Sequence, residues 1–365
     1  MASDVNPLTR LLVSTLVAGL LALSGAASAR ADAITPAELA TVQAELGGFN
    51  LILSGSLSSN TETEGQAVIG GNVSGQTQFC FNGCQGNSDG YAALTVYGNI
   101  NGPGVKVFSG DIRVGGSING ATVSLQSGGG AAYVAGNNSG QIQGGNLYIS
   151  GSQNGSVQAP GTAYTGQPQS TTFPYGSFAT AFGTPLGNLS ATLATLTPTA
   201  TITTPSNNFV FNTASGVMEN GVLVTVYQIS ASTLASMSNI QGFNLSGSDI
   251  IIINVLGSTT SLPNLSNYAG AAGVIWNFPD ETGNLTFDGA WAGSVLAPNA
   301  NVTNDGDFTG TLVAASLTQD SELHSAPFTG NLSFLDSVVA TPEPASLTLM
   351  AGMLPVLALL RRRRR

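Results

Sequence analysis

Short glycine-rich segments that recur along the chain constrain its fold more than any other feature of the sequence. The five segments are IGGNVSG (69–75), VYGNING (96–102), VGGSING (114–120), VAGNNSG (134–140) and ISGSQNGSV (149–157). In each, an aliphatic residue leads to glycine, then to Asn or Ser, and then to glycine again. Glycine and asparagine tolerate the left-handed backbone of tight corners. The pattern therefore predicts short strands joined by tight turns.

The spacing of these segments favours a β-solenoid, in which short strands stack coil upon coil. The glycines Gly71, Gly98, Gly116, Gly136 and Gly151 are 27, 18, 20 and 15 residues apart, which suits such coils. Inward Val and Ile side chains from stacked coils would form a continuous core. Because the period is irregular, a β-sandwich with glycine-rich hairpins stays open as the alternative fold.

A few short helices accompany the expected strands. Thr35, Pro36 and Glu38 form a capping box with proline at the first helical position, and Gly47-Gly48 should end that helix. Leucines at helical spacing predict a second helix over 186–196.

Strand-like segments resume after residue 207, and the run 288–317 resembles two further coils. We expect these C-terminal strands to pack back on the N-terminal repeats. The result would be one β domain over 32–340, with a Thr/Ser/Pro-rich insertion at about 161–206. Within that insertion, TPTATITTPS (197–206) could be a linker or an exposed segment.

Charge excludes one class of partner. Between residues 33 and 340 the basic residues are Lys106 and Arg113, against sixteen acids, for a net charge of −14. Such a surface repels phosphate backbones, so we expect no nucleic-acid partner.

The first 31 residues are typical of a secretory signal peptide. Arg10 precedes the apolar run Leu11–Leu23, and Ala27-Ser28-Ala29 matches a cleavage site. Export to an oxidising compartment would let Cys80 and Cys84, in FCFNGCQGN, form a local disulfide.

Candidates for chemistry are sparse. A glycan hydrolase needs two carboxylates flanking the bond, and the candidates are Asp280, Glu281, Asp305, Asp307 and Glu322. No recognisable motif places any of them. Asp305 and Asp307 could contribute oxygen ligands to calcium, but the remaining spacing of a calcium-binding loop is missing. We therefore expect no enzyme, no catalytic residue and no cofactor, with calcium as a weak alternative.

The last 25 residues resemble a PEP-CTERM sorting signal. Its parts are the triplet Pro342, Glu343 and Pro344, the apolar run Ala345–Leu360, and the arginines Arg361, Arg362, Arg363, Arg364 and Arg365. The resemblance implies a Gram-negative bacterium, an exosortase partner and transient anchoring in the inner membrane. An apolar helix of this length spans about 24 Å, short of the roughly 30 Å hydrocarbon core. A permanent tail anchor is the alternative.

The body of the chain resembles the choice-of-anchor A domain. The matching segments are FNLILSGSLSSNTETEGQAVIGGNVSG (49–75), GVIWNFPDET (273–282), WAGSVLAPNANV (291–302), GDFTGTLVAASL (306–317) and SELHSAPFTG (321–330). That family implies a secreted surface module without a defined activity. Its closing motif contains Glu322, His324 and Phe328, and we expect His324 to bond within the last coil.

Three functions follow, in order of preference. The first is a non-enzymatic, surface-sorted structural or adhesive protein of the exopolysaccharide matrix, whose Asn, Ser and Thr side chains would meet sugar hydroxyls or ordered water. The second is a glycan-active enzyme on a β-solenoid. The third is an ice- or surface-binding solenoid, which needs a flat, regular array of threonines, and the irregular repeats argue against it.

Overall fold

A computed structural model describes most of the chain between its two termini. The described residues are 33–81, 84, 92–126, 130–167, 176–203, 208–211, 216–237, 239–241, 249–264 and 271–336. They belong to one compact unit that begins at Ala33. The expected signal peptide, 1–31, and the expected sorting tail, 341–365, lie outside the described residues.

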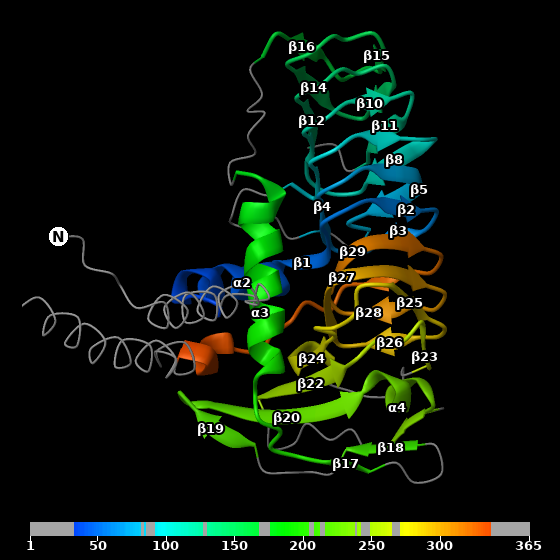
Figure 1. The fold of residues 1–365 in the computed structure, drawn as a ribbon. Helices are drawn as coiled ribbons and strands as arrows, with labels where there is room; N and C mark the ends of the chain where they lie inside the picture. The colour runs from blue at the N-terminus through cyan, green and yellow to red at the C-terminus, as the bar shows by residue number, and fades with distance from the viewer. Residues whose placement is uncertain are drawn as a thin grey trace, which may run out of the picture. The chain divides into compact units, whose positions relative to one another are not determined.

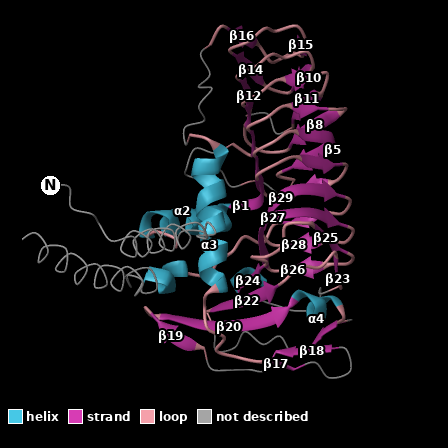
Figure 2. Ribbon diagram, viewed as in Figure 1, coloured by secondary structure: helices cyan, strands magenta, loops and turns pink. Residues whose placement is uncertain are grey.

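Parallel strands stack rung upon rung to form the body of this unit (Figure 2). Among the described residues, 27 strands hydrogen-bond into one continuous sheet. Each coil contributes up to three short strands, so the stack has three faces. The stack confirms the predicted β-solenoid, and the β-sandwich alternative is wrong.

The first face, which we call the helix face, carries the strands on which the helices pack. Its N-terminal strands are β1 (Phe49–Leu53), β4 (Gln66–Ile69), β6 (Leu94–Val96), β9 (Ile112–Val114), β12 (Ala131–Val134), β14 (Asn146–Ile149) and β16 (Ala163–Thr165). Its C-terminal strands are β20 (Val222–Ser230), β22 (Ile250–Leu256), β24 (Val274–Asn277) and the first halves of β27 (Ser294–Asn304) and β29 (Leu312–Gln319).

The other two faces are named by their side chains. The polar face has β2 (Leu57–Ser59), the start of β5 (Val73–Phe79), β7 (Ile100–Asn101), β10 (Ile118–Asn119), β23 (Ser261–Leu262), β25 (Asn284–Phe287) and the second halves of β27 and β29. The charged face has β3 (Glu62–Thr63), the end of β5, β8 (Gly104–Val107), β11 (Thr122–Leu125), β13 (Gln141–Gln143), β15 (Ser156–Val157), β26 (Trp291–Ala292), β28 (Phe308–Thr309) and β30 (Leu323–His324).

The order of coils in space differs from their order in the chain. The chain enters in the middle at β1 and winds to one end of the stack at β16 (Figure 1). It then crosses to the other end and winds back from β20 to β30. The last coil closes against the first, because β29 pairs in parallel with both β1 and β2. This seam confirms that the C-terminal strands pack back on the N-terminal repeats.

Two helices cover part of the helix face. The helix α2 (Pro36–Gly48) has the predicted capping box between Thr35 and Glu38, and it ends at Gly48, where Phe49 is the C-cap, as predicted. The crossover helix α3 (Thr184–Ala194) is the predicted helix 186–196, shifted by two residues, and a π-helical turn (Ala179–Gly183) precedes it. Their apolar sides pack on outward residues of the sheet such as Ile52 and Val313.

Smaller elements complete the end of the stack near β20. They are α4 (Ala231–Ala235), β19 (Val217–Glu219), which pairs antiparallel with β20, and a separate sheet of β17 (Ile202–Thr203), β18 (Asn208–Phe211) and β21 (Asn239–Gln241). Two 3-10 turns, Ala271–Gly273 and Leu332–Leu335, precede β24 and follow the last coil. None of the described helices is long and apolar enough to cross a membrane.

The repeated glycines form one corner of the stack. The N–H of Gly98 donates to the carbonyl of Gly71 at 3.0 Å, and the N–H of Gly116 donates to that of Gly98 at 2.9 Å. A Cβ atom at Gly116 would lie 2.6 Å from the Gly98 carbonyl oxygen. Only glycine permits this approach, which explains the repeat pattern.

Candidate ligand-binding face

Two columns of short polar side chains run along the polar face. On most coils a buried residue separates two outward residues, as the alternation of a strand requires. From the β23 end of the stack, the outward pairs are Thr259 with Ser261, Asn284 with Thr286, Asn301 with Thr303, Ser316 with Thr318, Ser56 with Ser58, Asn72 with Ser74, Asn99 with Asn101, Ser117 with Asn119, Asn137 with Ser139, and Ser152 with Asn154. Every member is Thr, Ser or Asn. The first members form the corner column, the second members form the middle column, and together they are the polar array.

Hydrogen bonds between coils fix the corner column. The Oδ1 atom of Asn72 accepts the N–H of Asn99 at 2.8 Å, and Asn99 Oδ1 accepts the N–H of Ser117 at 2.7 Å. The ladder continues as Ser117 Oγ accepts from Asn137 at 2.9 Å and Asn137 Oδ1 accepts from Ser152 at 2.8 Å. In this part of the column, the side chains of Asn72, Asn99, Ser117 and Asn137 are therefore each held by the backbone of the next coil.

Hydroxyls at the centre of the middle column are available to a ligand. Within the described part of the chain, the hydroxyls of Thr303, Thr318 and Ser58 make no hydrogen bond to the protein. Thr318 and Ser58 are exposed, and Thr303 is half-buried between its neighbours. Each of these groups can both donate and accept a hydrogen bond.

The sheet fixes the dimensions of the array. Neighbouring coils place equivalent residues about 4.8 Å apart along the stack, and residues two apart on one strand are about 6.7 Å apart. The buried residues between the pairs, such as Leu57, Val73 and Leu317, are fully packed in the core. The array is thus a repeating, rigid set of hydroxyl and amide groups.

Comparison with known proteins places the chain in a family. The model of the ice-binding-like adhesive domain family matches residues 42–137 and 123–325, which is most of the chain. The chain belongs to this family. None of the curated proteins matches it. A solved ice binding protein from an Antarctic bacterium of the Flavobacteriaceae aligns with 80% of this chain and 84% of its own, at 14% identity and a TM-score of 0.23. A TM-score this low supports no conclusion.

The polar array of this adhesive domain is more regular than its sequence predicts. Irregular repeats were expected to prevent a regular array, yet the array is in register over ten coils. The reason is that extra residues are inserted outside the polar face, so its register is kept. Between Ala297 and Asn301, for example, β27 has two more residues than the paired stretch of β29. The overlooked signal was the Asn-x-Ser/Thr triplet, which at Asn72, Asn284 and Asn301 is one outward pair of the array.

The charged face of the adhesive domain gathers several acids around one histidine. His324 Nδ1 lies 3.2 Å from Glu64 Oε1, and its Nε2 lies 3.9 Å from carboxylate oxygens of both Asp307 and Glu322. His324 therefore contacts Glu322 of its own coil and, at a shorter distance, Glu64 of the first coil across the seam, a partner that the sequence did not predict. Burial, and then the charges of Glu322 and Glu64, raise the pKa of Glu62 beside them, while His324 acts to lower it.

The remaining acidic candidates are apart from this cluster. Asp305 lies at the corner between the polar and charged faces, and its side chain is not among those around His324. Asp280 and the buried Glu281 accept backbone N–H groups of Gly257 and Thr259, so they hold a turn together. Among the described residues, no group of acids, histidines or cysteines is arranged to hold a metal ion.

The adhesive domain also contains the predicted disulfide between Cys80 and Cys84. Cys80 is fully buried and its N–H donates to the carbonyl of Thr63 at 3.0 Å. The bridge thus ties the turn after β5 to the charged face of the first coil.

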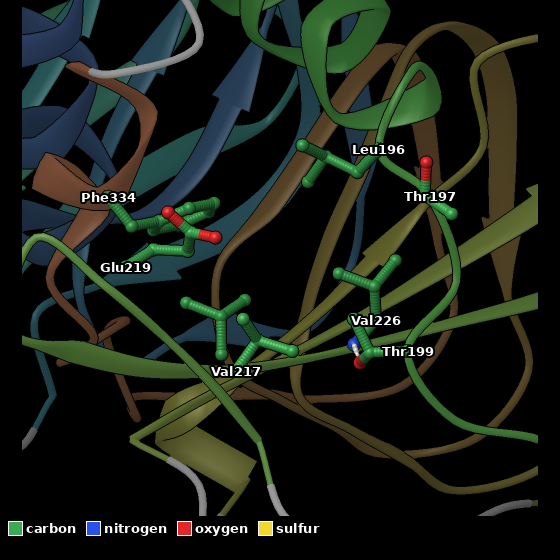
Figure 3. Close-up of a pocket in the computed structure, with 8 residues that line it drawn as sticks. Leu196, Thr197, Thr199, Val217, Glu219, Val226 and Phe334 are labelled. Carbon is green, nitrogen blue, oxygen red and sulfur yellow. Dashed lines mark hydrogen bonds between the residues drawn. The ribbon is translucent and has the colours of Figure 1, made fainter.

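A pocket of about 230 Å³ opens beside β19 and β20 (Figure 3). Its lining is mainly apolar, with Leu196, Val217 and Phe334 around the opening and Glu219 as the single ionisable side chain. A glycosidase needs two carboxyl groups at its site. This pocket does not supply them.

Proposed function

We propose that the polar array binds ordered water at an ice surface, so that the protein acts as a non-enzymatic, ice-binding adhesive domain. The observation that carries the proposal is the composition of the array, in which twenty outward positions on ten coils hold only Thr, Ser and Asn. The family to which the chain belongs supports the same reading.

The chemistry of the array suits a lattice of water. Free hydroxyls such as those of Thr303 and Thr318 can each donate and accept, as water does. Because the sheet holds them at a fixed repeat, little side-chain freedom is lost on binding. Neither column contains a charged residue, and the nearest carboxylates, those of Asp288, Asp305 and Asp320, lie at the edge of the face beside the middle column. Binding through the two columns themselves therefore desolvates no ion.

Each of the other two faces is a poorer candidate. Helices cover part of the helix face. The charged face carries Lys106, Glu62, Glu322 and Asp307 on one outward column, and a surface charge keeps its own hydration shell. The polar face is the one that stays uncharged along its outward columns.

Substitution of the array tests the proposal. Thr318→Tyr and Thr303→Tyr place a bulky ring in the middle column, and Gln143→Tyr places the same ring on the charged face. We expect the first two variants to lower thermal hysteresis at least fivefold, while Gln143→Tyr leaves it unchanged. Equal activity in all three variants at equal melting temperature would overturn the assignment of the face.

A matrix glycan is the second candidate ligand of the array. The charge of the ligand can be inferred from three acidic residues beside the middle column. Asp288, Asp305 and Asp320 are exposed there, at the edge between the polar face and the charged face. These carboxylates would repel an anionic polysaccharide, so we infer a neutral exopolysaccharide. A pull-down with neutral and acidic glycan fractions tests this, and retention of the acidic fraction alone would contradict it.

We further propose that the protein is exported and sorted to the cell surface. The resemblance of the tail to a PEP-CTERM signal, together with an adhesive domain, supports export, transient anchoring in the inner membrane, and processing by an exosortase-type enzyme. The resemblance to the choice-of-anchor A domain supports the same destination, the outer surface or matrix. Mass spectrometry of the mature protein should find new ends near residues 31 and 341, and an intact tail in the extracellular fraction would contradict the proposal.

A further inference from the structure

A stack of tyrosines leads to one end of the solenoid. On the helix face beyond the helices, one outward column runs Arg113, Tyr133, Tyr148 and Tyr164. The ring centroids of Tyr133 and Tyr148 are 5.1 Å apart, and those of Tyr148 and Tyr164 are 4.8 Å apart, with nearly parallel planes. The Arg113 guanidinium covers the other end of the stack, 4.7 Å from the Tyr133 ring.

The last rung of this stack presents a strand edge. β16 pairs with β14 on one side, and among the described residues no strand pairs with its other side. All three of its residues are exposed, and Tyr164 keeps 40% of its surface accessible. A free edge of this kind offers backbone N–H and C=O groups to another strand.

Charge normally prevents such pairing, and here it is missing. Proteins usually blunt free edges with lysine or other charged side chains. No Asp, Glu, Lys, Arg or His occurs from residue 114 to residue 218. The end at β16 is therefore neutral in a domain that is otherwise strongly acidic, so two copies can approach there without repulsion.

The opposite end of the stack is different. β19 pairs antiparallel with β20, so it occupies part of the outer edge of the terminal strand there. Growth of the solenoid from head to tail is blocked at that strand. A contact between two copies must then join like ends, which makes it a closed two-fold interface.

We propose that two copies of this chain associate end to end through β16, forming an antiparallel edge pair with one Tyr164 opposite the other. The two-fold axis passes close to Tyr164, where a cross-strand aromatic pair adds to the backbone hydrogen bonds. The dimer extends the stacked tyrosines from one copy to the next. It also leaves the polar arrays of both copies open, so it is independent of the ligand of that face.

Disulfide trapping of the full chain tests the geometry. Both native cysteines are already joined to each other, so an added cysteine reports its own surroundings. Tyr164→Cys should form a covalent dimer on mild oxidation, because the axis brings the two new thiols together. Ser58→Cys, exposed at the centre of the polar face, is the matched control and should stay monomeric.

A second variant measures the strength of the contact without a new bond. Tyr164→Lys should keep the melting temperature within a few degrees and raise the dimer dissociation constant at least tenfold in light scattering or ultracentrifugation. A wild-type chain that stays monomeric at about 100 µM, a concentration at which even a weak dimer forms, would overturn the proposal. So would equal cross-linking of the two cysteine variants, or shielding of the new thiol in monomeric Tyr164→Cys from a maleimide reagent.

Discussion

The N-terminal coils and the C-terminal coils share one backbone plan but fill it differently. Inside the stack, the N-terminal coils use mostly aliphatic residues such as Ile112 and Val123, whereas the C-terminal coils combine aliphatic residues with several large aromatic ones. Trp291 contacts both Trp276 and Phe287 edge to face, with ring centroids 4.9 Å apart in each case. The same coil geometry thus accommodates two kinds of core.

The outward column of the helix face shows a sharper contrast. Near the seam it consists of Leu296, Val313, Ile52 and Val68, all buried under helices. A few coils further on, the same column becomes Arg113 and then three tyrosines. The polar array does not change in this way between the two regions. The comparison shows that the residues of a face depend on what covers it. The polar array keeps the same kinds of side chain along its whole length, which indicates that the whole array has one function.

The largest expected effect comes from a charge placed in each half of this column. Val313→Asp buries a carboxylate that has no partner under α3, so the free energy of unfolding should fall by about 3 kcal/mol or more. Tyr148→Asp, in the uncovered part, should cost about 1 kcal/mol or less. Urea denaturation of both variants measures the difference, and equal losses would show that the helices do not seal the column.

A second prediction concerns the carboxyl group buried beside the helix-covered region. Glu45 on α2 is 5% exposed, and burial raises its pKa to about 9. Burial of Tyr97 itself, followed by the charge of Glu45, raises the pKa of Tyr97 to about 12.

The stability of the protein should fall as the pH rises, because the pKa of Glu45 is higher in the folded state than in the unfolded state. The stabilising contribution of protonated Glu45 is complete below about pH 4.5, its unfolded value, and declines until the pH passes about 9. The slope is at most about 1.4 kcal/mol per pH unit. Glu45→Gln should remove this decline between pH 5 and pH 9. Glu38→Gln, which keeps the capping box, is the control and should retain it, and a decline that persists in Glu45→Gln would contradict the assignment.

The smallest expected effect on stability is in the polar array. Thr318→Val removes an exposed hydroxyl that makes no hydrogen bond to the protein, so stability should change by less than about 0.5 kcal/mol. If the hydroxyl binds ice, thermal hysteresis should still fall. A loss of stability as large as that of Val313→Asp would mean that the array is a structural element of the fold.

Local features of the fold could be predicted from the sequence. The Gly-Asn and Gly-Ser segments mark real corners, because a side chain at Gly116 cannot fit against the coil below. The capping box at Thr35 and Glu38 and the buried face of α2 also follow from local pattern. In each case the cause lies within a few residues of the effect.

Long-range features could not be predicted in this way. The seam depends on β29 pairing with β1, and nothing in either strand identifies the other. The array depends on register between coils of unequal length, so irregular spacing in the sequence concealed a regular surface. The contact between His324 and Glu64 could not be predicted either, because Glu64 lies in the first coil, across the seam.

Binding of the fluorescently labelled protein to a single ice crystal tests the central claim most directly. Wild-type protein and Gln143→Tyr should label defined planes of the growing crystal, and Thr303→Tyr and Thr318→Tyr should leave those planes dark. Labelling by all four proteins alike, or by none of them, would contradict the assignment of the polar array as the ice-binding surface.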